Sequence, residues 1–487
     1  MLDLSFVLGK HVTFPLMCCF SYLLYKELST DNDGGPTEGE NKVRKTDVTG
    51  QRKWEPLPLM KNEVHPSDSV WHRNKPFPYQ PFKAGEYKLT MGIRPIPMGD
   101  WLVLDQTYKD RIEAKWQIIR EEYRDVMFFL DPAMINDHRK NGADSGGVGI
   151  EDAPPLQQET IITAQDVENC RVALCELYDH VVSYLVERFP QYFEVSLSPT
   201  EESPGVLHNK VLDEFHPVDP RQYLHASEAE LKFMKYRCQD TDMITTTKPT
   251  QEPGTTNGQR DAVGYKCLVT CNETRRAHEL ILALMRLVEE DLLLMLPNAS
   301  GQFDNEYFLF VGCFAFAAGF NPRQRFMKPL TLVHGPVPEY KQKLQSHMNR
   351  FFQMHKMGKL VMRLNFSFQT HPRLYVTNDN KGTDDESIPA MTLEELRGGH
   401  GLFYRSERQC LVRLGPNSRA MCFSIKTYLW NMAEQFLTDE HYSQTPVLQD
   451  MHDAIAGMQE NVGQYKRRPE WGPALLTLLK ERMKVTT

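Results

Sequence analysis

Three strand-like segments follow one another closely in the C-terminal third of the chain. Residues 361–368, 408–414 and 419–432 each contain several apolar residues over the length of a strand, and residues 419–432 are also rich in β-branched and aromatic residues. The link at residues 415–418 reads Gly-Pro-Asn-Ser, so the last two segments are predicted to form a β-hairpin. Because the strands of a hairpin are antiparallel, we expect an antiparallel sheet in this part of the chain.

Helical patterns lie before and between these strands. The apolar positions of residues 163–189 recur with helical spacing behind a capping-box-like start at Thr163. Residues 275–291 and 339–356 repeat this spacing, whereas residues 307–317 form a compact apolar run typical of a strand buried on both faces. Strands with helices before, between and after them predict an α+β domain.

The composition sets broad limits on what the protein can be. The chain has 487 residues, of which 41% are hydrophobic and 25% charged, which is ample for a large globular core. The net charge of −8 and the lack of a basic stripe argue against a nucleic-acid partner. The ten cysteines form no C-x-x-C pair, which disfavours structural zinc and leaves no C-x-x-C-H motif for covalent c-type heme.

The chain divides into three parts by composition. Residues 1–28 are largely apolar, and residues 29–70 are rich in polar residues, glycine and proline, as expected of a solvated linker. Residues 71–487 have the composition of a globular domain. Two polar stretches, near residues 138–160 and 239–260, are predicted to be insertions in this domain.

The apolar N-terminal segment has three interpretations. Its core at residues 12–24 is shorter than the roughly 20 residues that a membrane helix needs, and no A-x-A cleavage site follows it. The segment is a helix docked on the domain, a membrane anchor or a cleaved signal. The expected location is therefore cytoplasmic or membrane-tethered through residues 1–28.

Several familiar catalytic motifs are absent from the sequence, and His334 is the histidine with the most distinctive surroundings. The chain contains no H-E-x-x-H, no P-loop and no G-x-S-x-G. His334 follows a strand-like apolar run at residues 330–333 and precedes the stiff turn Gly-Pro-Val-Pro. This placement would hold an imidazole in one direction beside an apolar wall, as a heme ligand requires. The alternative is a histidine that caps the helix predicted at residues 339–356.

A second candidate group consists of charged and polar residues on the first strand of the hairpin. Alternation along a strand places Glu407, Gln409 and Arg413 on one face and Arg408 on the other. Arginines, including Arg405, are costly to bury in an apolar hairpin unless they meet anions. Those anions are heme propionates or the protein's own carboxylates.

A third group surrounds Arg94. The string Met-Gly-Ile-Arg at residues 91–94 precedes an apolar run at residues 101–105. Arg94 lies either on a strand edge that lines a pocket or in the hydrophobic core, where its own charge would be paired.

Five short strings occur in the order in which one protein family carries them. They are YKLTMGIR, DW, VHGPVPEY, LNFSF and YRSERQCLVRL, which begin at residues 87, 100, 333, 364 and 404. Together they resemble the heme-dependent oxidative N-demethylase-like family, long known only as a domain of unknown function. The resemblance runs from about residue 71 to residue 480, and R-S-E-R-Q-x-L-x-R-L is its most specific string.

The resemblance implies a fold, a cofactor and a set of site residues. The fold would be a PAS-like α+β core of antiparallel strands with surrounding helices, and the cofactor a non-covalent heme b. His334, in the family's H-x-P-V-P position, becomes the axial ligand of the iron. The residues expected to hold the cofactor are Arg405, Arg408, Gln409 and Arg413, and those expected in the pocket are Arg94, Asn365 and Glu407.

The resemblance also implies an activity. The protein would be an oxidoreductase, a heme-dependent monooxygenase that uses O2 to oxidise an N-methyl amine or a related small metabolite, including one of secondary metabolism. No flavin, nicotinamide or iron–sulfur motif is present, so a separate flavin and iron–sulfur reductase would supply the electrons. The alternative function is a PAS-like sensor or interaction protein that binds heme or a small ligand without turnover.

Overall fold

The computed structural model describes residues 54–76, 82, 90–136, 160–196, 205–225, 272–383, 386–398 and 401–485. Trp54–Thr487 forms one compact unit. The N-terminal segment 1–28, the insertion at 239–260 and all of the 138–160 insertion except Thr160 lie outside the described residues.

The compact unit begins inside the segment that we expected to be a linker. Helix α2 (Pro58–Glu63) lies within residues 29–70, and its Met60 is fully buried in the core. Leu57, just before the helix, donates its backbone N–H to Ser183 on the long helix α4 (Ala164–Arg188). The few apolar residues of this segment are thus enough to anchor it, and the linker prediction is wrong for residues 54–70.

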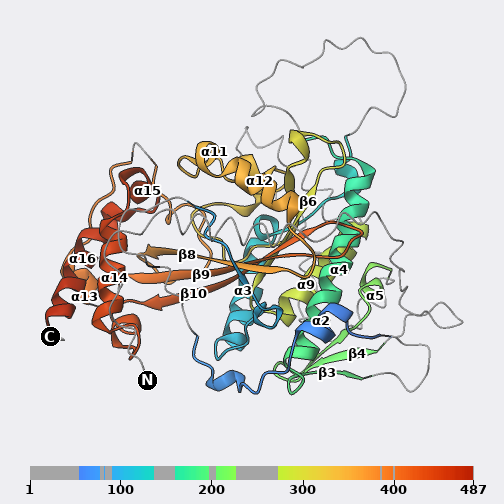
Figure 1. The fold of residues 1–487 in the computed structure, drawn as a ribbon, viewed down its shortest axis with the longest axis horizontal. Helices are drawn as coiled ribbons and strands as arrows, with labels where there is room; N and C mark the ends of the chain where they lie inside the picture. The colour runs from blue at the N-terminus through green and yellow to red at the C-terminus, as the bar shows by residue number, and fades with distance from the viewer. Residues whose placement is uncertain are drawn as a thin grey trace, which may run out of the picture. The chain divides into compact units, whose positions relative to one another are not determined.

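A seven-stranded antiparallel sheet forms the centre of the unit (Figure 1). Its strand order is β1-β8-β9-β10-β6-β7-β2, and every neighbouring pair is antiparallel. The strands are β1 (Arg94–Ile96), β2 (Met127–Phe129), β6 (Asp291–Pro297), β7 (Tyr307–Cys313), β8 (Leu360–Gln369), β9 (Phe403–Arg413) and β10 (Met421–Asn431). A smaller antiparallel sheet contains β3 (Phe193–Ser196), β4 (Val206–Asn209) and β5 (Glu214–Pro217).

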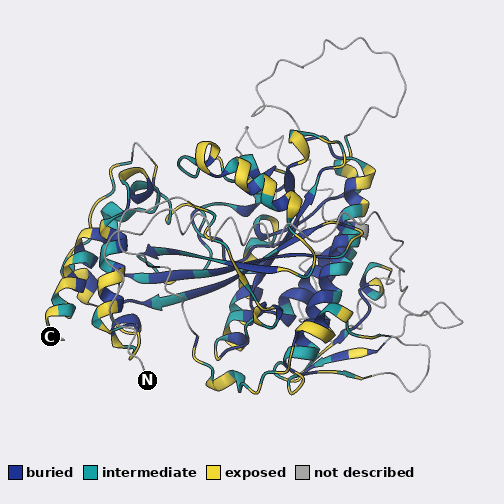
Figure 2. Ribbon diagram, viewed as in Figure 1, coloured by how far each residue is buried: buried dark blue, intermediate teal, exposed yellow. Residues whose placement is uncertain are grey.

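Helices surround the central sheet, which confirms the predicted α+β class. Buried residues are concentrated along the central strands and on the sides of the helices that face them (Figure 2). The helices not yet given are α3 (Tyr108–Val126), α5 (Arg221–Leu224), α9 (Asn272–Leu287), α10 (Leu330–Val333), α11 (Tyr340–Lys343), α12 (Gln345–Met354), α13 (Leu393–Arg397), α14 (Thr445–Ala456), α15 (Glu460–Tyr465) and α16 (Arg468–Val485). In the described part of the chain, no helix combines the length and the apolar character needed to cross a membrane.

Three local predictions are confirmed. The hairpin pairs β9 with β10 from Met421 opposite Arg413 to Asn431 opposite Phe403. The capping box at Thr163 starts α4, and β7 is buried along its whole length.

Two local predictions are wrong. Residues 330–333 form the helical turn α10 rather than a strand, because the Glu306 carboxylate accepts the backbone N–H of Thr331 and so stabilises the start of a helix. The helix expected at residues 339–356 is divided into α11 and α12 at Leu344, whose φ of −121° departs from helical geometry.

The two faces of the central sheet carry different side chains. On one face, Arg408 of β9 donates to the carbonyl oxygen of Trp101, and the Trp101 ring packs edge-on against Tyr184 of α4. Side chains alternate along a strand, so Glu407 and Gln409 point to the opposite face, away from α4. That opposite face borders a cavity.

Candidate functional site

A cavity of about 260 Å³ lies between this face of the sheet and the segment that contains α10 and the turn after it. Strands β6 to β10 form its floor. Its apolar lining, on the floor and the wall together, consists of Leu293, Met295, Leu309, Phe314, Ala318, Phe320, Pro322, Leu330, Val333, Pro336, Val337, Phe423 and Ile425. Its polar and charged lining consists of Arg325, His334, Arg363, Asn365, Ser367, Asn380, Lys381, Glu407, Gln409, Tyr465 and Lys466.

His334 enters the cavity from the end of α10. Its Nδ1 lies 2.9 Å from the carbonyl oxygen of Leu330, one helical turn earlier. A neutral imidazole can only donate to a carbonyl, so Nδ1 carries the hydrogen and Nε2 keeps its lone pair. No described residue hydrogen-bonds Nε2. The ring stacks on Tyr340, with centroids 5.1 Å apart and an interplanar angle of 14°.

The surroundings of His334 keep its ring uncharged. Burial among apolar side chains lowers the pKa of His334 to about 4, and the nearby charges of Arg363 and Arg325 act in the same direction. At neutral pH, Nε2 is therefore a lone-pair donor, which is the form in which histidine binds a metal.

Glu306 fixes the position of α10. Its carboxylate accepts the backbone N–H of Thr331 at 3.0 Å and the side-chain hydroxyl of the same residue. Asn349 of α12 donates to the same carboxylate, and Gln345 donates to the Thr331 hydroxyl at 2.9 Å. This cluster ties the turn that carries His334 to α12.

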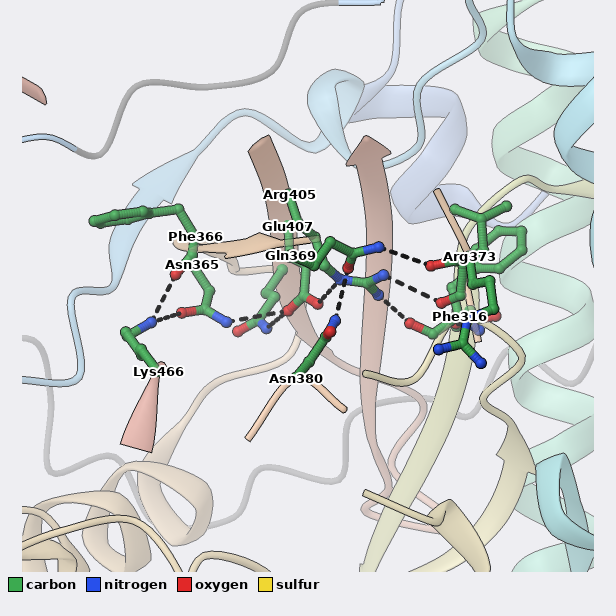
Figure 3. A network of polar contacts seen from close by, with 12 residues as sticks. Phe316, Asn365, Phe366, Gln369, Arg373, Asn380, Arg405, Glu407 and Lys466 are labelled. Carbon is green, nitrogen blue, oxygen red and sulfur yellow. Dashed lines mark hydrogen bonds and ion pairs between the residues drawn. The ribbon is translucent and has the colours of Figure 1, made fainter. Parts of the chain in front are cut away.

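A chain of polar contacts runs along the cavity floor (Figure 3). The Glu407 carboxylate accepts hydrogen bonds from Arg405 at 3.0 Å, from Asn365 at 3.2 Å and from Gln409 at 2.9 Å. Burial alone would raise the pKa of Glu407, but the Arg405 charge and these hydrogen bonds lower it below its usual value. Glu407 is therefore ionised at neutral pH.

Lys466 ends this chain on the side of the C-terminal helices. Its Nζ donates to the Asn365 side-chain oxygen at 3.3 Å and to the Phe366 carbonyl oxygen at 2.6 Å. Burial lowers the pKa of Lys466 to about 8, although the Glu407 charge opposes this shift. Lys466 remains mostly charged at neutral pH.

Two further cations lie where the cavity meets a larger polar hollow. Arg325 and Lys381 line both the cavity and this hollow, whose volume is about 810 Å³. Burial lowers the pKa of each, and neither forms an ion pair with a described residue. The hollow contains neither His334 nor Glu407. We therefore place the candidate site in the smaller, mainly apolar cavity.

The structure brings four of the predicted site residues together. His334, Asn365, Glu407 and Gln409 all line the cavity. Arg405 shares their face of the sheet but is not among the lining residues, because its terminal nitrogens donate to the carbonyl oxygens of Leu374 and Phe316.

The other three predicted residues lie elsewhere. Arg408 is on the opposite face, where it donates to backbone carbonyls of Asp100 and Trp101. Arg413 donates to the Tyr307 hydroxyl at 2.8 Å and to the backbone carbonyls of Arg419, His355 and Phe352. Arg94 is exposed on β1 at the edge of the sheet.

Sequence reasoning missed the other basic residues of the cavity. Arg363 was detectable, because it shares a face of β8 with Asn365 and is registered opposite Gln409. Arg325, Lys381 and Lys466 lie outside the strands, in loops or at a helix end, and no periodicity marks them.

Within the described residues, no group of three or more histidine, cysteine, aspartate or glutamate side chains could hold a metal ion. A model of the family described as haem-dependent oxidative N-demethylase, alpha subunit-like, matches residues 155–259 and 259–476. This match contains His334 and all lining residues of the cavity, whereas the strings at residues 87–94 and 100–101 precede it. No curated protein matches the chain.

Proposed function

The chain belongs to the haem-dependent oxidative N-demethylase, alpha subunit-like family, and from this membership we propose that it binds heme b in the cavity and oxidises an N-methyl amine. The observation that carries the proposal is His334, a neutral imidazole on the cavity wall whose Nδ1 is hydrogen-bonded to a backbone carbonyl. Metal-binding histidines are typically oriented in this way, which also raises the basicity of the other ring nitrogen.

The remaining lining residues fit a heme as well. Apolar side chains suit the porphyrin, and two basic residues, Arg325 and Lys381, suit the propionates at the edge that opens to the polar hollow. We assign the propionates to this pair rather than to Arg405, Arg408 and Arg413, whose nitrogens already meet acceptors of the protein.

The cavity has to widen to accept the cofactor. Its volume of about 260 Å³ lies just below the range of about 300–1,000 Å³ that is usual for sites of drug-sized ligands. The wall opposite the sheet consists of the four-residue helix α10 and a proline-rich turn rather than a long packed helix. We expect this wall to move outward on binding.

The order of the strands supports the PAS-like part of the proposal. The hairpin β6–β7 is followed by the short helices α10 to α12 and then by the meander β8–β9–β10. The last strand of the meander pairs with β6, the first strand of the hairpin. The proposed ligand lies between this five-stranded core and the helices, as a PAS-like ligand would.

The reaction would remove one methyl group from the amine. When bound, heme b would supply the activation of O2. One oxygen atom enters the C–H bond next to nitrogen, and the other leaves as water with two electrons and two protons from outside. The carbinolamine then breaks its C–N bond to give formaldehyde and the shortened amine.

The protein's own residues would hold and shield the reactants. His334 would hold the cofactor through its free ring nitrogen, and Glu306 keeps the His334 turn in place through Thr331. The apolar wall, with Phe314 and Phe423, excludes water from the reacting atoms.

The electrons would come from a partner. The description "alpha subunit-like" supports a protein that works with another subunit, and we propose a separate flavin and iron–sulfur reductase in this role. The protein alone, given a nicotinamide donor, should therefore be inactive.

Turnover by the complete system tests the proposal. The full chain, loaded with heme b, is combined with a flavin and iron–sulfur reductase, a nicotinamide donor and a panel of N-methyl amines. We expect formaldehyde and oxygen consumption only when the chain, the reductase and an amine are all present. A heme that is reduced but yields no formaldehyde from any amine would contradict the enzyme proposal and support the sensor alternative.

A further inference from the structure

Two charged groups that line the cavity are not assigned to the cofactor. Glu407 and Lys466 both line the cavity, and each contacts the side-chain amide of Asn365 (Figure 3). Resting on the proposed function, we propose that these three residues select a zwitterionic substrate, an N-methylated amino acid. The substrate's ammonium would bind Glu407, and its carboxylate would bind Lys466.

Glu407 has capacity for one more donor. A carboxylate offers about four acceptor sites, and three are used, one on Oε1 by Arg405 and two on Oε2 by Asn365 and Gln409. No other described residue donates to Glu407. Arg405 does not line the cavity, so it stabilises the Glu407 charge from the side away from the cavity. The remaining acceptor site, on Oε1, fits the N–H of a methylated ammonium.

Lys466 lacks an anion. Two of its three ammonium hydrogens go to neutral oxygens, those of the Asn365 side chain and the Phe366 backbone. It forms no ion pair with any carboxylate in the described part of the chain. A partly buried cation without an anion is poorly stabilised, so an incoming carboxylate that takes the third hydrogen is favoured.

The heme propionates do not account for Lys466. The pair assigned to them, Arg325 and Lys381, lines both the cavity and the polar hollow. Lys466 and Glu407 line the cavity but not the hollow. The opening thus has its own two cations for the two propionates, which leaves Lys466 for a third anionic group.

Asn365 sets the distance between the two charges. Its Nδ2 donates to Glu407 and its Oδ1 accepts from Lys466, so both contacts fix the same orientation of the amide. Opposite charges separated by one amide match a molecule whose ammonium and carboxylate are a few atoms apart. A simple methylamine would satisfy Glu407 but leave Lys466 partly buried and unpaired, so the site disfavours it.

Calorimetric titration tests the inference. The full chain, incubated with heme b, is titrated with N-methylglycine, with dimethylamine and with acetate. We expect N-methylglycine to bind at least about tenfold more tightly than either single-charge compound, since a charge-assisted hydrogen bond is worth about that much. The three affinities can be compared whether or not the chain retains heme, so this result does not depend on the proposed cofactor.

Paired variants assign each charge. Lys466→Met should weaken N-methylglycine at least about tenfold and leave dimethylamine within about threefold. Glu407→Gln should weaken both amines. Lys480→Met and Glu394→Gln, at exposed positions outside the cavity, are the matched controls and should bind like the wild type.

Other results would overturn the inference. Equal affinity for N-methylglycine and dimethylamine would do so, as would a Lys466→Met variant that keeps full affinity for N-methylglycine. If Lys466→Met does not fold, judged by thermal unfolding, Lys466→Gln takes its place, and Lys466→Arg should retain the preference. Formaldehyde production from dimethylamine without any preference for the amino acid would overturn this inference and leave the proposed function intact.

Discussion

The Nδ1 atom of His334 and the carbonyl oxygen of Leu330 are 2.9 Å apart, across one turn of α10. This contact decides which ring nitrogen carries the hydrogen, and it leaves the Nε2 lone pair for a ligand. Burial, which lowers the pKa of His334 to about 4, keeps the ring neutral in the range where the protein is expected to work. The local backbone thus leaves His334 in the tautomer that the proposed heme binding requires.

Acid should destabilise the protein through buried histidines. Burial lowers the pKa of His278 to about 3 and that of His180 to about 4. The unfolded chain, with histidine pKa values near 6.5, binds these protons more readily, so the free energy of unfolding falls as the pH drops below about 6.5. We expect a loss of about 2 kcal/mol per histidine between pH 7 and pH 5.

Urea unfolding at pH 7 and pH 5 measures this effect. The variant His278→Gln should lose less stability than the wild type over this range, by about 2 kcal/mol. The exposed His347→Gln should show the wild-type loss. Identical losses in the wild type and His278→Gln would contradict a neutral, buried His278.

Removal of Arg405 should strongly destabilise the fold. Its guanidinium is 1% exposed, pairs with Glu407 and donates to two backbone carbonyls. Arg405→Leu leaves the Glu407 charge buried without its cation, and breaking such a pair costs about 3–5 kcal/mol. The control is Arg373→Leu, because the Arg373–Asp379 pair is more than half exposed and such pairs contribute about 0–1 kcal/mol. Equal free energies of unfolding for the two variants would argue against the assigned structural role of Arg405.

Retention of heme should depend on the two cations at the opening. Arg325→Ala and Lys381→Ala would each remove a proposed charge-assisted contact to a propionate, so heme loss should be faster by about tenfold or more in each. The control is Lys328→Ala, an exposed position near Arg325 that does not line the cavity. Transfer of heme to excess apomyoglobin gives the rate. Rates equal to that of Lys328→Ala in both variants would place the propionates elsewhere.

The β9–β10 hairpin shows which features of the site can be predicted from the sequence alone. Alternation along β9 correctly separates Glu407 and Gln409 from Arg408, because side-chain direction in a strand has a period of two. Alternation does not reveal that Arg405 meets the carbonyl oxygens of Phe316 and Leu374, since those oxygens come from other segments. The face of a residue was therefore predictable, and its partner was not.

The secondary structure of the short segment before His334 could not be predicted from its local sequence pattern. Four apolar residues before the histidine are too few to distinguish a strand from a helical turn. The deciding contact is between Thr331 and Glu306, 25 residues earlier in the chain. Lys466 follows Asn365 by 101 residues, and no pattern in the sequence connects them. Such long-range pairs appear only when the fold brings the segments together.

The absorption spectrum of the heme-loaded chain, compared between the wild type and His334→Ala, shows whether His334 binds the iron. We expect a Soret band in the wild type and release of non-covalent heme b into acidified organic solvent. Because the proposed iron ligand is lost, His334→Ala should shift or lose the Soret band. His347→Ala, on the exposed side of α12, should match the wild type. A wild-type chain that takes up no heme would rule out the proposed cofactor, and a His334→Ala spectrum identical to that of the wild type would rule out His334 as its ligand.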